Sequence, residues 1–184
     1  MSVSQGLLIT TDDYRLLPES SPRCQLVEGE LFMSPAPNRY HQKISGNLEF
    51  ILKKYLEKNP IGELYDAPFD VFLTEHNVFQ PDKVFISKSR SGILTDLGAE
   101  GAPDFVVEIL SESTAHVDKE LKRKVYANSG VEELWLINPE EKMIEVYYLQ
   151  KNPTTVAATY GERDVLTSPI FPNLEVNAAE IFQR

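Results

Sequence analysis

The most informative run of the sequence is PDFVVEIL at residues 103–110, in which Glu108 interrupts an otherwise apolar segment. A short apolar run of this kind is typical of a central strand that is covered on both faces. Burying a carboxylate in such a strand is costly unless the carboxylate is paired or binds a metal ion. We therefore take Glu108 as a candidate metal ligand, and the alternative interpretation is an ion pair with a nearby lysine.

A second acidic residue, Asp82, stands just before another apolar run, VFI at residues 84–86. Neighbouring strands lie about 4.8 Å apart, so two carboxylates on the same face can share one divalent cation. Asp104 is a poorer partner, because four residues at about 3.3 Å each place it roughly 13 Å from Glu108 along the strand. We predict that Asp82 and Glu108 form the metal site and that Asp104 is a strand-entry or turn residue.

The remaining pattern predicts a sheet with two main helices. The first helix is expected from about residue 38 to residue 58, where apolar residues recur at helical spacing. The second is expected from Thr114 to about Asn128, with Ser113 as its cap and Gly130 as its stop. Strands are predicted at residues 63–65, 69–73, 84–86 and 105–110, and hairpins at 25–33 and 134–149.

This interleaving of strands and helices predicts an α/β or α+β fold, in which a mixed sheet is flanked by helices and preceded by an N-terminal β-hairpin. Residues 87–102 contain three glycines and are expected to be mainly a connection. With 184 residues, the chain has the length of one well-buried domain, and we predict a single domain over residues 1–184.

Composition limits the possible functions. The chain has one cysteine and three scattered histidines, which excludes an internal disulfide and a zinc-ligand pattern, so a metal site must be rich in oxygen ligands. The N-terminus has no basic region followed by an apolar core, and no apolar run is long enough to span a membrane. These features predict a soluble cytoplasmic protein with no membrane partner.

The net charge of −10 argues against a protein that coats nucleic acid with a broad basic surface. A local basic groove is still compatible with this charge. Lys119, Lys122, Arg123 and Lys124 form a candidate basic patch, although acidic neighbours dilute it and a solvated helix face is the plainer interpretation.

Three further residues are candidates for the site. Lys122 stands on the helix that follows Glu108, where a cation can stabilise negative charge that develops on phosphorus; an ordinary surface ion pair with Asp118 is the alternative. His41 shares a stripe of its helix with apolar residues, which favours a position facing the sheet. Glu30 follows the turn at Gly29 and can supply another carboxylate or simply face solvent. We treat His41 and Glu30 as secondary candidates.

The combination of several short motifs resembles the Uma family of restriction-endonuclease-like proteins, and the resemblance covers roughly residues 9–182. The matching motifs are LVEGEL at residues 26–31, MSPAP at 33–37, HQ at 41–42, QPD at 80–82, EGAPD at 100–104 and EILS at 108–111, followed by Asp118, Lys122, Tyr126, Gly130, Val131 and Trp135. Three positions depart from the family pattern, namely Gln25, Lys83 and Leu134.

That family resembles a branch of the PD-(D/E)XK nucleases. The resemblance implies a magnesium-dependent endonuclease (manganese being a possible substitute) in which Asp82 and Glu108 bind the metal ion. The lysine expected two residues after the second acid is replaced by Leu110, and Lys122 on the following helix matches the substitute lysine of the family. The implied partner is nucleic acid, DNA being favoured over RNA, and a homodimer is the assembly expected on general grounds. The alternative is a non-catalytic module of nuclease fold that binds protein or nucleic acid.

Overall fold

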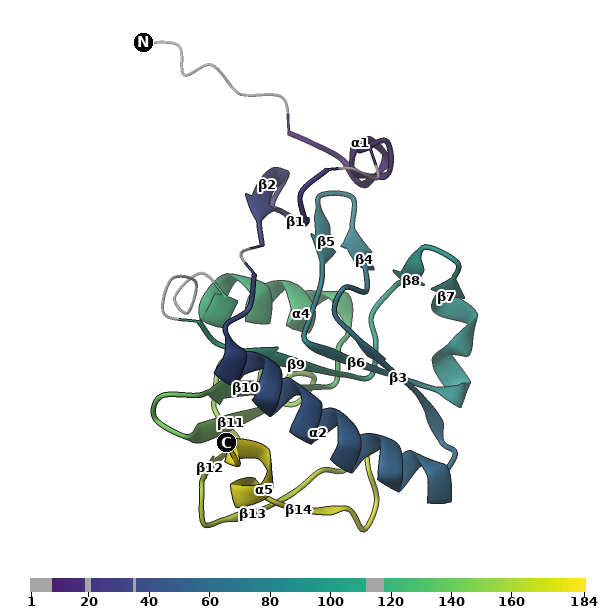
Figure 1. Cartoon of the computed structure of the whole chain (residues 1–184). Coiled ribbons are helices and arrows are strands. Elements are labelled where there is room, and N and C mark those ends of the chain that lie inside the picture. The colour runs from purple at the N-terminus through teal and green to yellow at the C-terminus, as the bar shows by residue number, and fades with distance from the viewer. Residues whose placement is uncertain (1–7, 19–20, 35, 112–117) are drawn as a thin grey trace.

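The chain folds into two six-stranded sheets with helices packed around them (Figure 1). The structure is a computed structural model and describes residues 8–18, 21–34, 36–111 and 118–184. The α-helices are α1 (Thr11–Arg15), α2 (Arg39–Lys58), α4 (Arg123–Ser129) and α5 (Ala178–Phe182). A 3₁₀-helix, η1, covers Lys88–Ile93, and a π-helical turn, η2, covers Asp118–Lys122 and leads directly into α4.

The main sheet has the strand order β12-β11-β10-β9-β6-β3. Its central strands β9 and β10 run parallel, and β6 pairs with β9 in antiparallel orientation. This mixed sheet confirms the predicted fold class. Its strands are β3 (Gly62–Asp66), β6 (Lys83–Ser87), β9 (Phe105–Ile109), β10 (Glu133–Asn138), β11 (Met143–Tyr148) and β12 (Ala158–Gly161).

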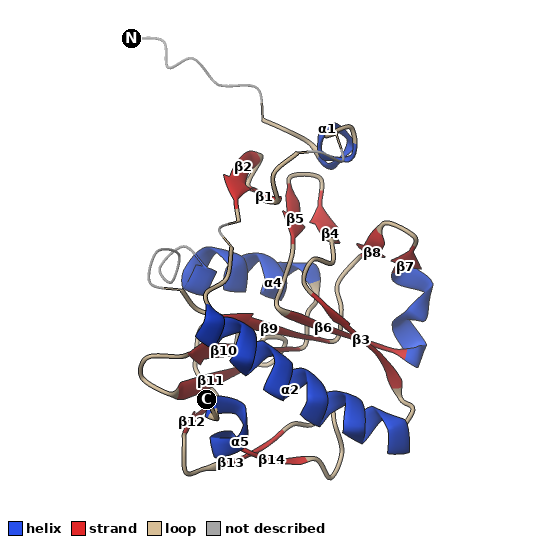
Figure 2. Cartoon of the chain, viewed as in Figure 1, coloured by secondary structure: helices blue, strands red, loops and turns tan. Residues whose placement is uncertain are grey.

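The second sheet has the order β2-β1-β5-β4-β8-β7 and begins with the predicted N-terminal hairpin. Figure 2 shows its strands as a group above the main sheet. Its strands are β1 (Cys24–Val27), β2 (Glu30–Met33), β4 (Val71–Thr74), β5 (Asn77–Phe79), β7 (Leu94–Thr95) and β8 (Gly98–Glu100). A small antiparallel pair, β13 (Val165–Thr167) and β14 (Glu175–Asn177), precedes α5.

Successive side chains of β9 point to opposite faces of the sheet and pack into two separate hydrophobic cores. Phe105, Val107 and Ile109 pack with α2 and the C-terminal segment, whereas Val106 packs with Val125 and Tyr126 of α4 and with strands β10 and β11. In Figure 1, α2 crosses one face of the main sheet and α4 lies on the other. Both faces of β9 are therefore covered, as the apolar run predicted.

The two predicted helices and both hairpins are present. Asn38 caps α2 by accepting a hydrogen bond from the His41 amide, and Ile44, Leu48 and Leu52 form its buried stripe. Gly130 ends α4 in the left-handed region at φ 102°. The predicted cap Ser113 and the first residues of that helix lie outside the described residues.

The predictions missed the shortest strands. Residues 87–102, expected to be mainly a connection, contain η1 and the antiparallel pair β7–β8. Strand β5 (Asn77–Phe79), which follows a two-residue turn after β4, was not among the predicted strands. Predicted strand 69–73 is shifted in the structure to Val71–Thr74.

Candidate active site

Strand pairing brings the two candidate metal ligands together. The antiparallel register pairs Lys83 with Val107 and Val84 with Val106, and one further step sets Asp82 beside Glu108. Asp82 Oδ2 accepts a hydrogen bond of 2.7 Å from the amide of Ile109, the residue after Glu108. Asp82, immediately before β6, and Glu108 of β9 therefore lie side by side, as the predicted pairing of these segments required.

Glu108 is buried, and Lys122 and Tyr126 of the helical segment across from it bind its carboxylate. Lys122 Nζ lies 3.0 Å from Glu108 Oε1, and the Tyr126 hydroxyl donates to the same oxygen at 2.5 Å. The side chains of Lys122 and Glu108 are 5% and 7% exposed. Removing one member of such a buried pair leaves the other charge without compensation, which is strongly unfavourable. The ion pair that was the alternative for Glu108 is thus present, and it is made with the lysine predicted for the site.

His41 lies against the other acid. Its Nε2 is 3.4 Å from Asp82 Oδ2 and 3.2 Å from the carbonyl oxygen of Ile109. Burial disfavours the charged imidazole, but the hydrogen bond and charge of Asp82, the Ile109 carbonyl and the charge of Glu108 outweigh burial and raise the pKa of His41. The structure therefore joins His41, from the start of α2, to Asp82, and the charge of Glu108 also acts on it.

The donors gathered here suit a small hard cation. Asp82 and Glu108 have carboxylate oxygens, and the Ile109 carbonyl oxygen lies nearby, within hydrogen-bonding distance of His41. No group of three or more His, Cys, Asp or Glu residues able to hold a metal ion occurs in the described part of the chain. Magnesium commonly uses one or two carboxylates and completes its shell with water and substrate phosphate oxygens, so a two-carboxylate site fits this ion.

Lys83, which departs from the family pattern, is accommodated on the α2 side of the sheet. Its side chain is buried, and Nζ lies 2.5 Å from Asp66 Oδ1 and donates to Ser45 Oγ at 2.7 Å. Burial alone raises the pKa of Asp66, but Lys83, then a hydrogen bond with Glu49 and the charge of Lys53 outweigh it, so the pKa of Asp66 is lowered. The charge of Lys83 is therefore neutralised locally by Asp66.

The candidate basic patch does not form one surface. Lys122 points inward to Glu108, Lys119 pairs with Glu145 at 2.9 Å, and Arg123 donates to the Pro153 carbonyl. Lys124 is exposed. Three of the four cations thus make separate contacts and the fourth is exposed, so they do not form a single basic surface.

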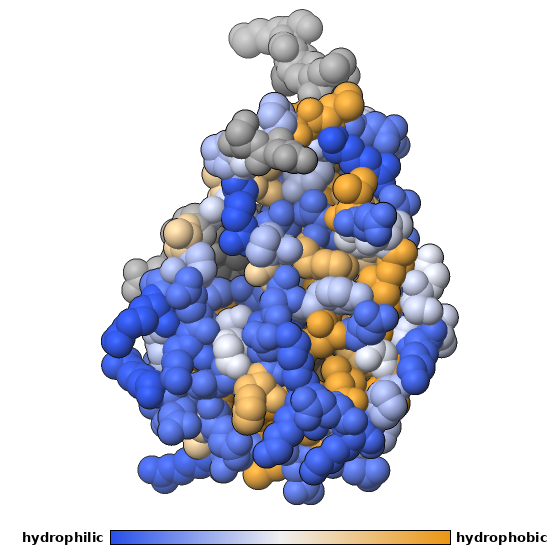
Figure 3. Space-filling model, turned by 45° about the vertical axis from the view of Figure 1, so that its right-hand side comes forward, coloured by the Kyte–Doolittle hydropathy of each residue, from blue (hydrophilic) through white to orange (hydrophobic). Residues whose placement is uncertain are grey.

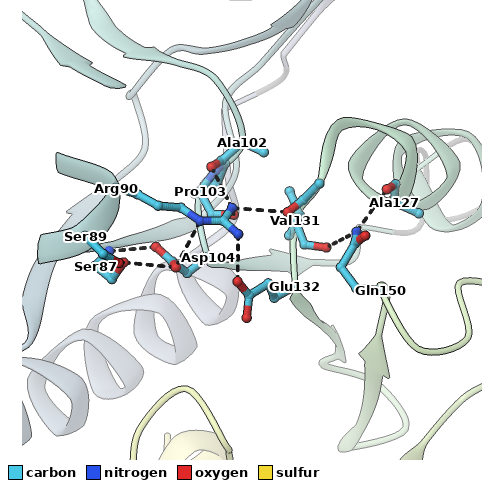
Figure 4. Close-up of polar contacts among 11 residues, drawn as sticks. Ser87, Ser89, Arg90, Ala102, Pro103, Asp104, Ala127, Val131, Glu132 and Gln150 are labelled. Carbon is cyan, nitrogen blue, oxygen red and sulfur yellow. Dashed lines mark hydrogen bonds and ion pairs between the residues drawn. The ribbon is translucent and has the colours of Figure 1, made fainter. Parts of the chain in front are cut away.

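Asp104 has the structural role that its position predicted. Its carboxylate accepts hydrogen bonds from the Ser87 amide at 2.6 Å and the Ser87 hydroxyl at 3.0 Å. Arg90 lies 3.3 Å from it and also donates to the carbonyls of Ala102 and Gly130 (Figure 4). These contacts fix the entry to β9 and make no link to Glu108.

Glu30 is not joined to the other candidates. It lies on the edge strand β2 of the second sheet and is exposed along with the rest of that strand. Among the described residues, no hydrogen bond or ion pair connects it with Asp82 or Glu108. Gln25 accepts a hydrogen bond from the backbone amide of Gln80 at 3.0 Å and so anchors the segment that leads to Asp82.

Two groups of the site were missed by sequence reasoning. Tyr126 was named among the family motifs without a role, whereas its hydroxyl donates a hydrogen bond to Glu108. The Ile109 carbonyl gives no signal in a sequence, since every residue has one. The helical stripe that contains both Lys122 and Tyr126 was the available clue for the tyrosine.

The fold places the chain among restriction-endonuclease-like proteins. The family model named Uma2, described as "Putative restriction endonuclease", matches residues 11–179, and the chain belongs to this family. The crystal structure of a "putative nuclease belonging to DUF820" from Anabaena variabilis superposes with a TM-score of 0.79 at 21% identity, covering 95% of this chain and 97% of that one.

The type IIG restriction endonuclease BpuSI gives a TM-score of 0.41 at 16% identity over 83% of this chain and 17% of that one. No curated protein matches the chain. Within the described residues, no helix has the length and apolar character needed to cross a membrane.

Proposed function

We propose that this protein is a magnesium-dependent endonuclease of the cytoplasm that hydrolyses phosphodiester bonds of DNA. The observation that carries the proposal is the pairing of β6 with β9, which sets Asp82 beside Glu108 while Lys122 contacts Glu108 at 3.0 Å. Membership of a family of restriction-endonuclease-like proteins supports the reaction class. A fold alone does not determine chemistry, so the proposal depends on these side chains.

Asp82 and Glu108 are the residues that would hold magnesium. When bound, the ion supplies Lewis-acid polarisation of the scissile phosphate and lowers the pKa of bound water. Asp82 is kept in place by the Ile109 amide and by His41, and Glu108 by Tyr126. These contacts hold the carboxylates in position before substrate arrives.

Lys122 is the group that we propose stabilises negative charge on the phosphate. Its ammonium lies in a nearly inaccessible position beside Glu108 and 5.6 Å from the centroid of the Phe79 ring. A cation in a site that excludes water interacts more strongly with developing charge than one in solvent. His41, with its raised pKa, is placed to donate a hydrogen bond to Asp82.

The test is cleavage of supercoiled plasmid and single-stranded DNA with magnesium or manganese by the wild type and the variants Asp82→Ala, Glu108→Gln and Lys122→Met. We expect metal-dependent nicking that falls by about 100-fold or more in each variant, as for loss of one charge-stabilising group. Glu57→Gln, which removes an exposed charge on α2, is the control and should cleave normally. Circular dichroism of each variant checks that the fold is retained.

Equal cleavage by wild type and the three site variants would overturn the assignment of these residues. If all proteins are inactive, calorimetry with manganese decides between the two functions. Binding that is present in the wild type and lost in Asp82→Ala would favour the non-catalytic module with a retained metal site, and absence of binding in both would reject the metal site. A two-fold homodimer is the assembly that we propose, as the commonest for soluble proteins.

A further inference from the structure

A cavity of about 350 Å³ lies away from the paired acids, between β3, the turn joining β7 to β8, and the segment that leads from β5 to Asp82. Its size is within the range of about 300–1,000 Å³ that is typical of small-ligand sites. Figure 3 brings forward the side of the molecule that carries β7 and β8, where hydrophobic side chains lie between hydrophilic ones. The cavity residues that matter for its chemistry are Tyr65, Phe69, Asp70, Gln80, Asp96 and Leu97.

The charged groups of the cavity are acceptors, whereas the Tyr65 and Thr95 hydroxyls of its lining donate to Glu63 and Gly98. Asp70 and Asp96 contribute carboxylates, and the described residues of the lining include no lysine, arginine or histidine. The side-chain amide of Gln80 is oriented by a hydrogen bond of 2.7 Å that its Nε2 donates to Asp70 Oδ1. Its Oε1 is buried and has no hydrogen-bond partner among the residues that the structure describes. A buried acceptor without a partner is costly, so a donor that reaches this oxygen would be bound favourably.

The apolar part of the cavity is aromatic and flat. The rings of Tyr65 and Phe69 are stacked, with centroids 4.4 Å apart and an angle of 12° between their planes. Leu97, 64% exposed, also lines the cavity, from the turn between β7 and β8. Flat aromatic faces beside carboxylates attract planar cations through both dispersion and the ring quadrupole.

The position of the β7–β8 turn is fixed by its backbone. The Ala99 amide donates to the Asp70 carbonyl at 2.9 Å, and a Cβ at Gly98 would lie 2.1 Å from that same oxygen. Gly98 therefore permits a close approach that holds Asp96 and Leu97 against Asp70. Tyr14 of α1 adds a hydrogen bond of 3.2 Å to Asp70 Oδ1. The cavity is thus built by separate segments of the chain that fixed contacts hold together.

We propose that this cavity binds the guanidinium group of an arginine side chain presented by a basic protein partner. A guanidinium has five donors and no acceptor, stacks on aromatic rings and carries a permanent positive charge, which matches the two carboxylates, the unpartnered Gln80 Oε1 and the Tyr65–Phe69 pair. A nucleotide is less suited, because its phosphates would approach Asp70 and Asp96. The inference is independent of the proposed nuclease function.

A short segment of the chain links the cavity to the candidate active site. Gln80 is two residues before Asp82, and its backbone amide donates a hydrogen bond to the side chain of Gln25. An arginine bound to Gln80 would therefore contact the segment that positions a proposed metal ligand. The occupant is a protein group, whereas the paired acids are proposed to act on DNA.

The experiment is a titration of the ¹⁵N-labelled full chain with a short acetylated peptide that contains one arginine, followed by amide chemical shifts. The same peptide with citrulline, which has the shape of arginine without its charge, is the matched ligand control. We expect shifts at Phe69, Leu97 and Gly98 with the arginine peptide and none with the citrulline peptide. Spermidine and a mononucleoside are titrated separately to test a free polyamine and a base.

The variant Asp96→Asn is expected to weaken binding of the arginine peptide by about two- to five-fold, the effect of one exposed charge pair. Glu175→Gln, an exposed change on β14, should leave binding unchanged. Asp70→Asn is expected to weaken it further, and its fold is checked because Asp70 also binds Tyr14 and Gln80. Equal shifts with citrulline, shifts caused by spermidine or the nucleoside in place of arginine, or no shift at the cavity would each overturn the proposal.

Discussion

Two buried carboxylates of the main sheet accept hydrogen bonds from different kinds of donor. Glu108 on β9 contacts the ammonium of Lys122 and the hydroxyl of Tyr126. Glu133 on the parallel neighbour β10 is 1% exposed and is held by neutral donors, namely Trp135 Nε1 at 2.6 Å and Ser168 Oγ at 2.8 Å. Burial raises the pKa of Glu133 to about 7, although the hydrogen bonds of these donors lower it in part. A sequence pattern does not distinguish these two environments.

Glu133 should make the fold less stable as pH rises. Its folded pKa of about 7 exceeds the ordinary value of 4.5, so the folded state binds the proton more tightly than the unfolded state. The stabilisation of the folded state by this proton is complete below pH 4.5 and is lost as pH rises to 7. This loss lowers the free energy of unfolding by at most about 3 kcal/mol. Other carboxylates change in the opposite sense, so the difference between wild type and Glu133→Gln isolates the effect.

Urea unfolding of both proteins between pH 4.5 and about 8 checks this expectation. The free energy of unfolding of the wild type should fall relative to Glu133→Gln as pH rises through this window. The exposed change Glu57→Gln serves as the control for removal of a single carboxyl group. Parallel curves for wild type and Glu133→Gln would show that Glu133 ionises equally in the folded and unfolded states.

At the scale of single elements, two glycines on helices are expected to respond oppositely to alanine. Gly46 is exposed within α2, and a Cβ added to it would have no neighbouring atom within 4 Å, so Gly46→Ala should raise the free energy of unfolding by about 1 kcal/mol. Gly130 ends α4 at φ 102°, so Gly130→Ala should lower it by about 1–2 kcal/mol. Thermal and urea unfolding measure both, and shifts of the same sign would contradict the expectation.

The long elements were predictable because their patterns are local. Helix α2 carries a stripe of buried apolar residues between Asn38 and Pro60, and β9 is an apolar run interrupted only by Glu108. Strands β5 and β7, with three and two residues, are too short for any period to be detected. Their pairing, and hence the second sheet, depends on contacts between distant segments, which a single sequence does not reveal.

In the candidate site, too, local patterns were predictable and contacts between distant segments were not. Asp82 and Glu108 were placed together because the spacing between neighbouring strands is fixed. The binding of Tyr126 to Glu108 depends on how α4 packs across the sheet, and the binding of His41 to Asp82 depends on where α2 begins. The exposed position of Glu30 follows from the second sheet, which the sequence patterns did not predict.

For the whole molecule, the C-terminal segment completes the main core. Phe171 is fully buried and has edge contacts with Tyr55 of α2 and with Phe85 and Phe105 of the sheet, at centroid distances of 5.8, 4.8 and 5.2 Å. The segment after β12 therefore joins α2 to the strands that carry the candidate metal ligands. Loss of this ring would remove contacts from three elements at once.

Phe171→Ala should lower the free energy of unfolding by about 3–5 kcal/mol, because truncating a buried aromatic ring leaves a cavity. Phe50→Ala is the matched control, since Phe50 is 68% exposed and should change stability by no more than about 0.5 kcal/mol. Urea denaturation midpoints measure both variants. Similar midpoints for the two would mean that the C-terminal segment contributes little to the core.

The contact between Glu108 and Lys122 also affects how such proteins are recognised. The cation reaches the strand acid from η2, 14 residues further along the chain, and Leu110 on the strand side is left to pack against the α4 core. A sequence motif that requires lysine two residues after the acid does not match this chain, because Leu110 stands there. A three-dimensional template of two carboxylates and one ammonium would retrieve it, because such a template ignores the order in which the chain supplies these groups.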